Sequence, residues 1–172
     1  MGIAINCYNK GNIKGQYYVG GIIGGYGQYE NVINCFNFGN VNGLFAGGID
    51  GYAYGDVIIK NCYNIGTITN MNLNNIDGKT PARDVILGTY RTLDWLTWNE
   101  KLFYSSGMYN NSEYRNALSA IPDSSAQVET EDGKTLKGID AIIYIFNNNI
   151  PEEAAGYTLK PWYIGADGYP TF

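Results

Sequence analysis

Three cysteines are the residues of this chain whose spacing first suggests a site. Cys7, Cys35 and Cys62 lie 28 and 27 residues apart, and each stands between an asparagine and an aromatic residue. Three thiols cannot all pair within one chain, so a disulfide framework is not expected. We expect free, buried thiols that serve as small apolar packing groups.

Acidic residues are the second group that could do chemistry. The candidates are Glu30, Asp50 and Asp56 in the N-terminal part, and Glu129, Glu131 and Asp132 farther along. Cleavage of a polysaccharide needs two carboxyl groups held roughly 5 to 9 Å apart, and Asp50 and Asp56 could face one another. No acid recurs at a regular spacing, however, and the second group lacks the spacing of a calcium-binding loop. We expect solvated turn residues at both places.

Histidine is absent from the chain. This absence removes Ser-His-Asp and Cys-His nucleophilic chemistry, zinc bound by histidine, and the HExxH sequence of metalloproteases. We therefore expect no enzyme activity, no cofactor and no metal.

The cysteines mark an internal repeat. Segments 5–24 and 33–51 share one frame of asparagine, cysteine, aromatic residue, asparagine and glycine, and 61–68 repeats its first half. Apolar and polar residues alternate over short stretches that glycine or asparagine interrupts, which is typical of strands joined at corners. Units this short bury an apolar face only by stacking, strand on strand, about 4.8 Å apart. The sequence predicts an all-β fold, a short β-solenoid of parallel stacked coils with a period of 27–28 residues over 3–70.

Stacking in register places equivalent residues over one another. The predicted columns are Cys7, Cys35 and Cys62 pointing inward, Tyr8, Phe36 and Tyr63 pointing outward, Asn9, Asn37 and Asn64 at a corner, and Asn6, Asn34 and Asn61 beside them. Each asparagine amide can hydrogen-bond to its neighbours above and below. Gly11, Gly39 and Gly66 are expected to supply the left-handed or tight backbone of the corner.

This frame, followed by Val-Gly-Gly-Ile-Ile-Gly, resembles the GLUG-motif repeats of bacterial surface and secreted proteins. Gly21-Ile22-Ile23-Gly24 matches the four-residue motif. In the next unit Asp50 stands where a hydrophobic residue is usual, and the third copy of the motif is missing. The resemblance implies a repeat-built extracellular module of a bacterial protein.

Residues 71–172 lack the repeat and are predicted to form an irregular α+β cap, because the end of a solenoid exposes an open core. Ser112 is expected to cap a helix over 113–118, and Gly133 to occupy the turn of a hairpin between 127–130 and 134–137. Apolar residues between 139 and 146 recur at helical spacing. The segment 162–172 is expected to fold back as a strand onto the end of the solenoid.

Exposed aromatic residues form the candidate recognition surface. They are Tyr8, Phe36 and Tyr63, with Tyr17, Tyr18, Tyr26, Tyr29, Tyr52 and Tyr54 nearby. Their rings could stack on sugars while asparagine amides bond the hydroxyls. The favoured alternative is that the rings stabilise the ladder themselves. Trp95 and Trp98 could likewise mark a ligand cleft, but we expect them in the core of the cap.

Charge and hydropathy limit the partners. The net charge is −5 and the basic residues are scattered, so nucleic acid is not expected. The chain contains no apolar run of about 18 residues, so the sequence predicts no membrane-spanning segment. Because Met1-Gly2 leads directly into the first repeat, we expect a piece of a longer protein whose open N-terminal edge associates with itself.

The function expected from these features is that of a non-catalytic extracellular module of a bacterial surface or secreted protein. It would act as a stalk or as an adhesive surface for a host protein or a glycan. A carbohydrate-binding accessory module of a secreted enzyme is the first alternative. A β-helix enzyme that cleaves polysaccharides is the second.

Overall fold

The computed structural model describes residues 2–24, 29–52, 56–70, 127–148, 150 and 154–172. Between residues 80 and 119 it describes only the backbone of five short strands: β12 (Thr80–Pro81), β13 (Thr89–Tyr90), β14 (Leu96–Trp98), β15 (Leu102–Tyr104) and β16 (Ala117–Ser119). The described chain is mostly strand in parallel sheets, with one short helix, α1 (Gly138–Asn148). Within this described part, no helix has the length and apolar character that a membrane crossing requires.

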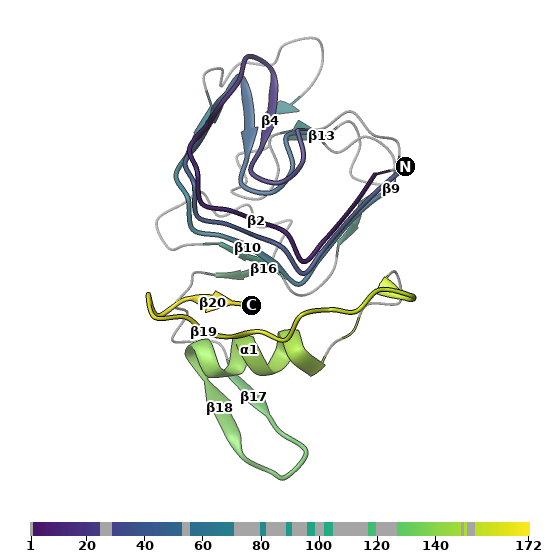
Figure 1. The fold of residues 1–172 in the computed structure, drawn as a ribbon, viewed down its shortest axis with the longest axis vertical. Coiled ribbons are helices and arrows are strands. Elements are labelled where there is room, and N and C mark those ends of the chain that lie inside the picture. The colour runs from purple at the N-terminus through teal and green to yellow at the C-terminus, as the bar shows by residue number, and fades with distance from the viewer. Residues whose placement is uncertain are drawn as a thin grey trace.

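The repeats form three layers. Layer 1 (residues 2–24) holds β1 (Gly2–Ile5), β2 (Tyr8–Asn9), β3 (Ile13–Lys14) and β4 (Tyr18–Gly20). Layer 2 (29–52) holds β5 (Tyr29–Ile33), β6 (Phe36–Asn37), β7 (Val41–Gly43) and β8 (Phe45–Gly47). Layer 3 (56–70) holds β9 (Asp56–Lys60), β10 (Cys62–Asn64) and β11 (Ile68–Asn70). Figure 1 looks along the stack, where each layer follows nearly the same bent path.

Equivalent strands of successive layers pair in parallel and in the register of the sequence repeat. Tyr8 pairs with Phe36 and Phe36 with Tyr63, while Ile13 pairs with Val41 and Val41 with Ile68. Between the strands, Val19, Val41 and Ala46 form a buried core inside the stack. The predicted columns therefore exist, and this parallel stacking is consistent with a solenoid-like arrangement.

Parallel pairing continues beyond residue 70, where the sequence-based boundary was placed. Strand β14 pairs with β9, β15 pairs with β10, and β16 pairs with β15. Ala117 and Leu118 belong to β16, so the helix predicted over 113–118 does not include them, and 113–116 lie outside the described residues. Sheet extension needs only a strand edge and backbone hydrogen bonds, which is why it proceeds without the repeat frame.

The C-terminal elements themselves agree with the sequence. Strands β17 (Gln127–Glu129) and β18 (Thr135–Lys137) pair as an antiparallel hairpin, and Gly133 in its turn has a φ of 80°. Helix α1 follows at once and buries Ala141, Ile142 and Phe146. Strands β19 (Tyr163–Ile164) and β20 (Pro170–Thr171) form a second antiparallel hairpin.

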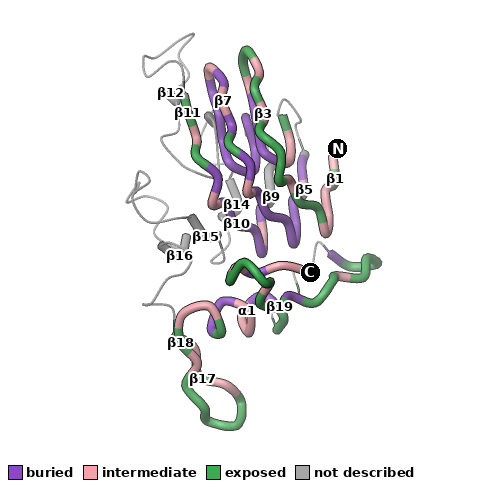
Figure 2. Tube along the Cα trace, turned by 60° about the vertical axis from the view of Figure 1, so that its left-hand side comes forward, coloured by how far each residue is buried: buried purple, intermediate pink, exposed green. Residues whose placement is uncertain are grey.

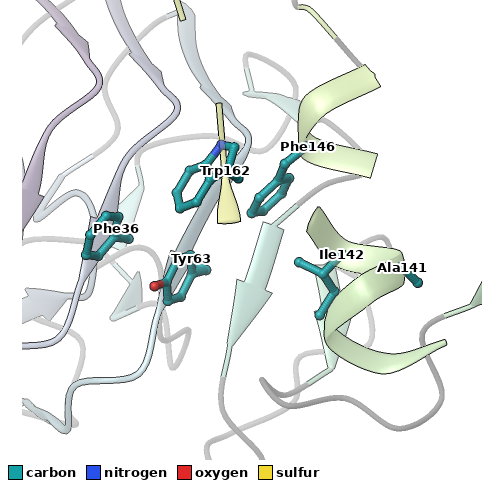
Figure 3. Close-up of a cluster of buried hydrophobic side chains, with 6 residues drawn as sticks. All are labelled: Phe36, Tyr63, Ala141, Ile142, Phe146 and Trp162. Carbon is teal, nitrogen blue, oxygen red and sulfur yellow. The ribbon is translucent and has the colours of Figure 1, made fainter. Parts of the chain in front are cut away.

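The expected docking of this segment onto the end of the stack is wrong. It lies along the side of the stack, beside β2, β6 and β10 (Figure 1). Phe36 of layer 2 and Tyr63 of layer 3 share one buried cluster with α1 and Trp162, which Figure 3 shows. The physical reason is that the outward rings of the repeats offer the apolar surface that α1 and the β19–β20 hairpin need in order to bury their own.

Glycine has a different role at the corners from the one expected. The residues with left-handed backbone are Asn6, Asn34 and Asn61, at φ values of 55°, 58° and 53°. Asparagine tolerates this conformation better than other residues with side chains. At Gly39 a Cβ atom would lie 1.9 Å from the carbonyl oxygen of Gly11, so glycine is needed there because adjacent layers approach closely.

Candidate functional site

The first asparagine column is a continuous hydrogen-bonded ladder. The amide Nδ2 of Asn9 donates to Oδ1 of Asn37 at 2.7 Å, and Nδ2 of Asn37 donates to Oδ1 of Asn64 at 2.6 Å. Within each layer the same side chain closes a tight turn, since Asn37 donates to the Gly39 carbonyl at 2.8 Å and accepts from the Gly39 N–H at 3.2 Å. Asn37 and Asn64 are fully buried. These amides are committed to holding the layers together.

The second asparagine column binds the C-terminal segment. Asn6 accepts a hydrogen bond from the Lys160 N–H at 2.9 Å and donates to the Thr158 carbonyl at 2.8 Å. Asn34 donates to Asn6 at 2.7 Å and to the Lys160 carbonyl at 3.1 Å, and its Oδ1 accepts from the Trp162 indole. A column expected only to link layers thus also recognises a segment more than 120 residues away.

The aromatic column stacks as predicted but is exposed at only one end. The ring centroids of Tyr8 and Phe36 lie 5.2 Å apart and those of Phe36 and Tyr63 lie 5.3 Å apart, each pair inclined by 10°. Phe36 and Tyr63 have 0% of their surface exposed, whereas Tyr8 has 56%. Trp162 covers both buried rings, with its centroid 5.7 Å from each. Phe36 and Tyr63 therefore do not belong to an open platform, and the favoured alternative, in which the rings stabilise the stack themselves, fits these two positions.

The other aromatic candidates divide in the same way. Tyr18 stacks on Tyr52 at 4.5 Å, and Tyr52 is only 1% exposed, so it belongs to the interior. Tyr17 is 61% exposed and remains available. Tyr26, Tyr54 and the side chain of Tyr29 lie outside the described residues, as do Trp95 and the side chain of Trp98.

Sequence reasoning missed two exposed rings in the C-terminal segment. Tyr157 and Tyr163 are 52% and 56% exposed, and Ile164 beside the latter is 47% exposed. They stand outside the repeat, so no periodic signal distinguished them from the core aromatic residues of the same segment. With Tyr8 and Tyr17 they are the large aromatic side chains that the described surface offers to a partner.

The three thiols repeat one geometry at the corner. Each donates to the carbonyl two residues earlier: Cys7 to Ile5 at 3.4 Å, Cys35 to Ile33 at 3.2 Å and Cys62 to Lys60 at 3.2 Å. Cys7 is exposed at the end of the column, and the other two are buried. The neighbouring Cys62 side chain, together with burial, raises the pKa of Cys35. The expectation of buried packing thiols is therefore met by Cys35 and Cys62 and is wrong for Cys7, which lies at the open end of the column.

Two acids of layer 2 are buried, contrary to the solvated turn residues expected. Glu30 is 5% exposed and Asp50 is 0% exposed. Burial first, and the nearby charge of Glu30 second, raise the pKa of Asp50 to about 7, although the Tyr52 N–H donates to its Oδ1 at 2.9 Å. Asp50 occupies the position that Ile23 fills in layer 1, since the two form a bridge, so the chain path carries it into the interior.

The remaining acids give no site in the described part of the chain. Glu129, Glu131 and Asp132 are exposed around the β17–β18 turn, as expected, and the Thr130 hydroxyl lowers the pKa of Asp132 by hydrogen bonding to it. The side chain of Asp56 is outside the described residues. Within those residues, no three cysteine, aspartate or glutamate side chains gather as a metal site. The site that can be described is thus a surface of exposed rings on a hydrogen-bonded stack.

Comparison with known proteins supports the repeat. The family described as "The GLUG motif" matches residues 15–42, which begin directly after β3 in layer 1 and end within β7 in layer 2. Searches of curated proteins and of solved structures found no match. The resemblance noted from the sequence is therefore confirmed: the chain carries a GLUG motif, in keeping with a GLUG-motif repeat protein.

Proposed function

We propose that this chain is a β-solenoid repeat module that works without catalysis, as a stalk or recognition surface of a bacterial surface or secreted protein. The observation that carries the proposal is the Asn9–Asn37–Asn64 ladder, because its amides link the layers and close each layer's turn at the same time. Such a stack resists local opening, since unpairing one layer breaks side-chain and backbone hydrogen bonds together. Rigidity of this kind suits a stalk outside the cell.

The C-terminal segment adds to this rigidity. Its backbone is hydrogen-bonded to Asn6 and Asn34, and its Trp162 and Phe172 rings pack on Phe36. Because Trp162 also packs on Tyr63 of layer 3, a single segment ties layers 1, 2 and 3 together along one side. This arrangement favours a role for the C-terminal segment as a brace of the stack, rather than as a separate domain with its own activity.

Trypsin digestion of the native chain tests the rigid module. Lys60 lies in β9, which pairs with β5 on one side and β14 on the other, whereas Lys134 is exposed in the β17–β18 turn. Of these two sites, Lys134 is expected to be cleaved first, with Lys60 resisting until the chain unfolds. Early cleavage after Lys60 would show that the stack opens in the native chain, and would contradict the proposal of a rigid stalk. The proposed location is tested separately, by antibody labelling of intact bacteria that express the complete gene.

Carbohydrate binding is the second candidate. It is favoured by the exposed rings of Tyr8 and Tyr17 in layer 1, and by the ammonium group of Lys10, 5.8 Å from the centroid of the Tyr8 ring. Such a surface can stack on a sugar and bond its hydroxyls. A glycan array should then register binding that Tyr8→Ala or Tyr17→Ala abolishes and that Tyr63→Phe, at a buried ring, leaves unchanged. An array without binding removes this candidate and leaves the stalk.

No catalytic role is proposed. Of the acids considered for a glycosidase, Glu30 and Asp50 are buried in layer 2 and so are not accessible to a polymeric substrate, and the side chain of Asp56 lies outside the described residues. The thiols are hydrogen-bonded packing groups. Incubation of the chain with a panel of polysaccharides, followed by measurement of reducing ends, tests this and is expected to give no product.

A further inference from the structure

Among the described strands, those of layer 1 lie at the end of every sheet that the repeats form. Strands β1, β2, β3 and β4 each stand last in their sheets, next to β5, β6, β7 and β8. Together they make one edge of four strands that follows the whole path of a layer. An edge of this length offers backbone N–H and C=O groups to a further strand.

This edge carries few of the features that proteins use to block strand addition, since its charge is limited to one residue and it has no proline. Lys14 is the only charged residue of β1 to β4, and none of their residues is proline. Ile3 is 40% and Tyr8 56% exposed, whereas Phe36, below Tyr8 in the column, is fully covered. Figure 2 shows the same contrast, with exposed residues frequent along β3 and buried residues along β5 and β7.

The ladder gives the edge a polarity. In layers 2 and 3 each ladder oxygen accepts two hydrogen bonds, and Oδ1 of Asn37 takes one from Gly39 N–H and one from Asn9 Nδ2. Oδ1 of Asn9 accepts from Gly11 N–H at 3.0 Å, and the position equivalent to the second donor lies outside layer 1. A carboxamide oxygen has two lone pairs, so it is shaped to receive an amide donor from above.

Asn12 and Asn40 form another asparagine position that links the layers, with the donor and acceptor layers reversed. Oδ1 of Asn12 accepts from the Asn40 N–H at 3.0 Å, and Oδ1 of Asn40 accepts from the Thr67 N–H at 3.0 Å. By the same register, the Asn12 N–H faces the place of an asparagine oxygen in a preceding layer. The edge thus specifies asparagine at two positions of whatever covers it.

We propose that the layer 1 edge docks another repeat layer of the same frame, with its asparagines above Asn9 and Asn12 and its aromatic ring above Tyr8. The proposal rests on the stacked module described under the proposed function. It names the partner by chemistry: a polypeptide layer with asparagine, cysteine, an aromatic residue, asparagine and glycine at the spacing of this repeat.

A second copy of this chain fits the edge less well. Its far end places Tyr104 and Ser119 in register with Asn64, and neither carries the carboxamide that the ladder needs. Two layer 1 edges placed face to face would bring one Asn9 oxygen toward the other, and two acceptors do not bond. The self-association expected from the sequence stays a prediction, and the hydrogen-bonding pattern of the edge favours docking of a repeat layer that has the full frame.

The test adds such a layer and measures the thiol of Cys7. In an extended chain, residues 29–55 are repeated directly before Met1, with Cys35→Ala in the added copy, so that the register of the repeat is kept. Cys7 is exposed in the unmodified chain, whereas Cys35 and Cys62 are buried. A maleimide should label Cys7 in the unmodified chain and do so at least about tenfold more slowly in the extended chain, because labelling then requires local opening.

The matched control is the same extended chain with Asn37→Asp in the added copy. A carboxylate only accepts hydrogen bonds, so it would face the Asn9 oxygen as a second acceptor and could not bond to it. Cys7 labelling is therefore expected to return toward the rate of the unmodified chain. Equal labelling of Cys7 in the extended and unmodified chains, with Cys35 and Cys62 still protected, would overturn the docking proposal alone. Rapid labelling of Cys35 in the unmodified chain would count against the stacked module itself.

Sedimentation of the unmodified chain completes the test. A monomer whose Cys7 remains reactive is expected at all concentrations. An oligomer in which Cys7 becomes protected would show that the edge takes a second copy, and the proposal of a separate repeat layer would fall.

Discussion

Asp50 provides the sharpest test of the interior of the stack. Its side chain is fully buried, Oδ1 accepts from the Tyr52 N–H, and Oδ2 has no hydrogen-bond partner in the described part of the chain. Burial and the charge of Glu30 raise its pKa from 3.8 to about 7. The folded chain therefore holds this proton more tightly than the unfolded chain does.

The sign and size of the effect follow from linkage. Because the folded pKa is raised, the stability that the protonated side chain contributes is complete below pH 3.8 and is lost as the pH rises through about 7. A shift of about three pKa units corresponds to roughly 4 kcal/mol of unfolding free energy. Asp50→Asn keeps an acceptor oxygen for Tyr52 and never ionises. The unfolding free energy of the variant minus that of the wild type should rise by roughly 4 kcal/mol from about pH 4 to pH 8.

Denaturant unfolding followed by tryptophan fluorescence measures this difference at several pH values. Subtracting the wild-type curve cancels the titration of the other groups. Asp132→Asn is the matched control, because Asp132 is exposed in the β17–β18 turn and has a lowered pKa. The unfolding free energy of Asp132→Asn minus that of the wild type should change little, and should fall slightly as the pH rises.

A difference between Asp50→Asn and wild type that stays flat over this pH range would refute the reasoning. It would mean that the Asp50 carboxyl ionises at its ordinary pKa and reaches water in the folded chain. The placement of Asp50 inside layer 2 would then be wrong, and with it the path of the chain after β8.

Three further changes test the ladder, the close approach of layers and the lateral brace. Asn37→Ala removes the buried centre of the ladder and should lower the unfolding free energy by about 3 kcal/mol. Asn9→Ala, at the edge of the ladder, should lower it by about 1 kcal/mol. Equal losses of unfolding free energy in the two variants would contradict the ladder. Gly39→Ala places a Cβ 1.9 Å from the Gly11 oxygen and should cost about 3 kcal/mol, whereas Gly11→Ala, with its nearest contact at 3.6 Å, should be nearly neutral in the same denaturant assay. Trp162→Ala should cost about 3 to 5 kcal/mol and make the chain bind a hydrophobic dye as Phe36 is uncovered; an unchanged midpoint would count against the brace.

Much of this structure was predictable because it is written locally and repeatedly. The frame around Cys7, Cys35 and Cys62 predicted the register of the layers, and parallel pairing of Tyr8, Phe36 and Tyr63 follows from it. The β17–β18 hairpin and α1 were also predictable, since a glycine in a turn and apolar residues at helical spacing act over a few neighbours.

The exposure of the candidate site was not predictable in the same way. The repeat pattern around an outward ring is the same whether water or another segment covers that ring. Phe36 and Tyr63 are covered by Trp162, which lies about 100 residues or more farther along the chain. Asp50 likewise looks like a turn acid beside glycine, yet the chain turns it inward beside Glu30. The left-handed backbone at Asn6 rather than at glycine was hidden by the fact that both residues tolerate it.

The sequence by itself determined that the layers stack and which residues share a column, because a repeated frame satisfies the same hydrogen bonds in every layer. Only the tertiary structure decided which columns are surface. The C-terminal segment buries two of three rings and engages the Asn6 column, while layer 1 keeps an open edge. Burial depends on contacts between segments far apart in the chain, and a periodic frame carries no information about what packs against it.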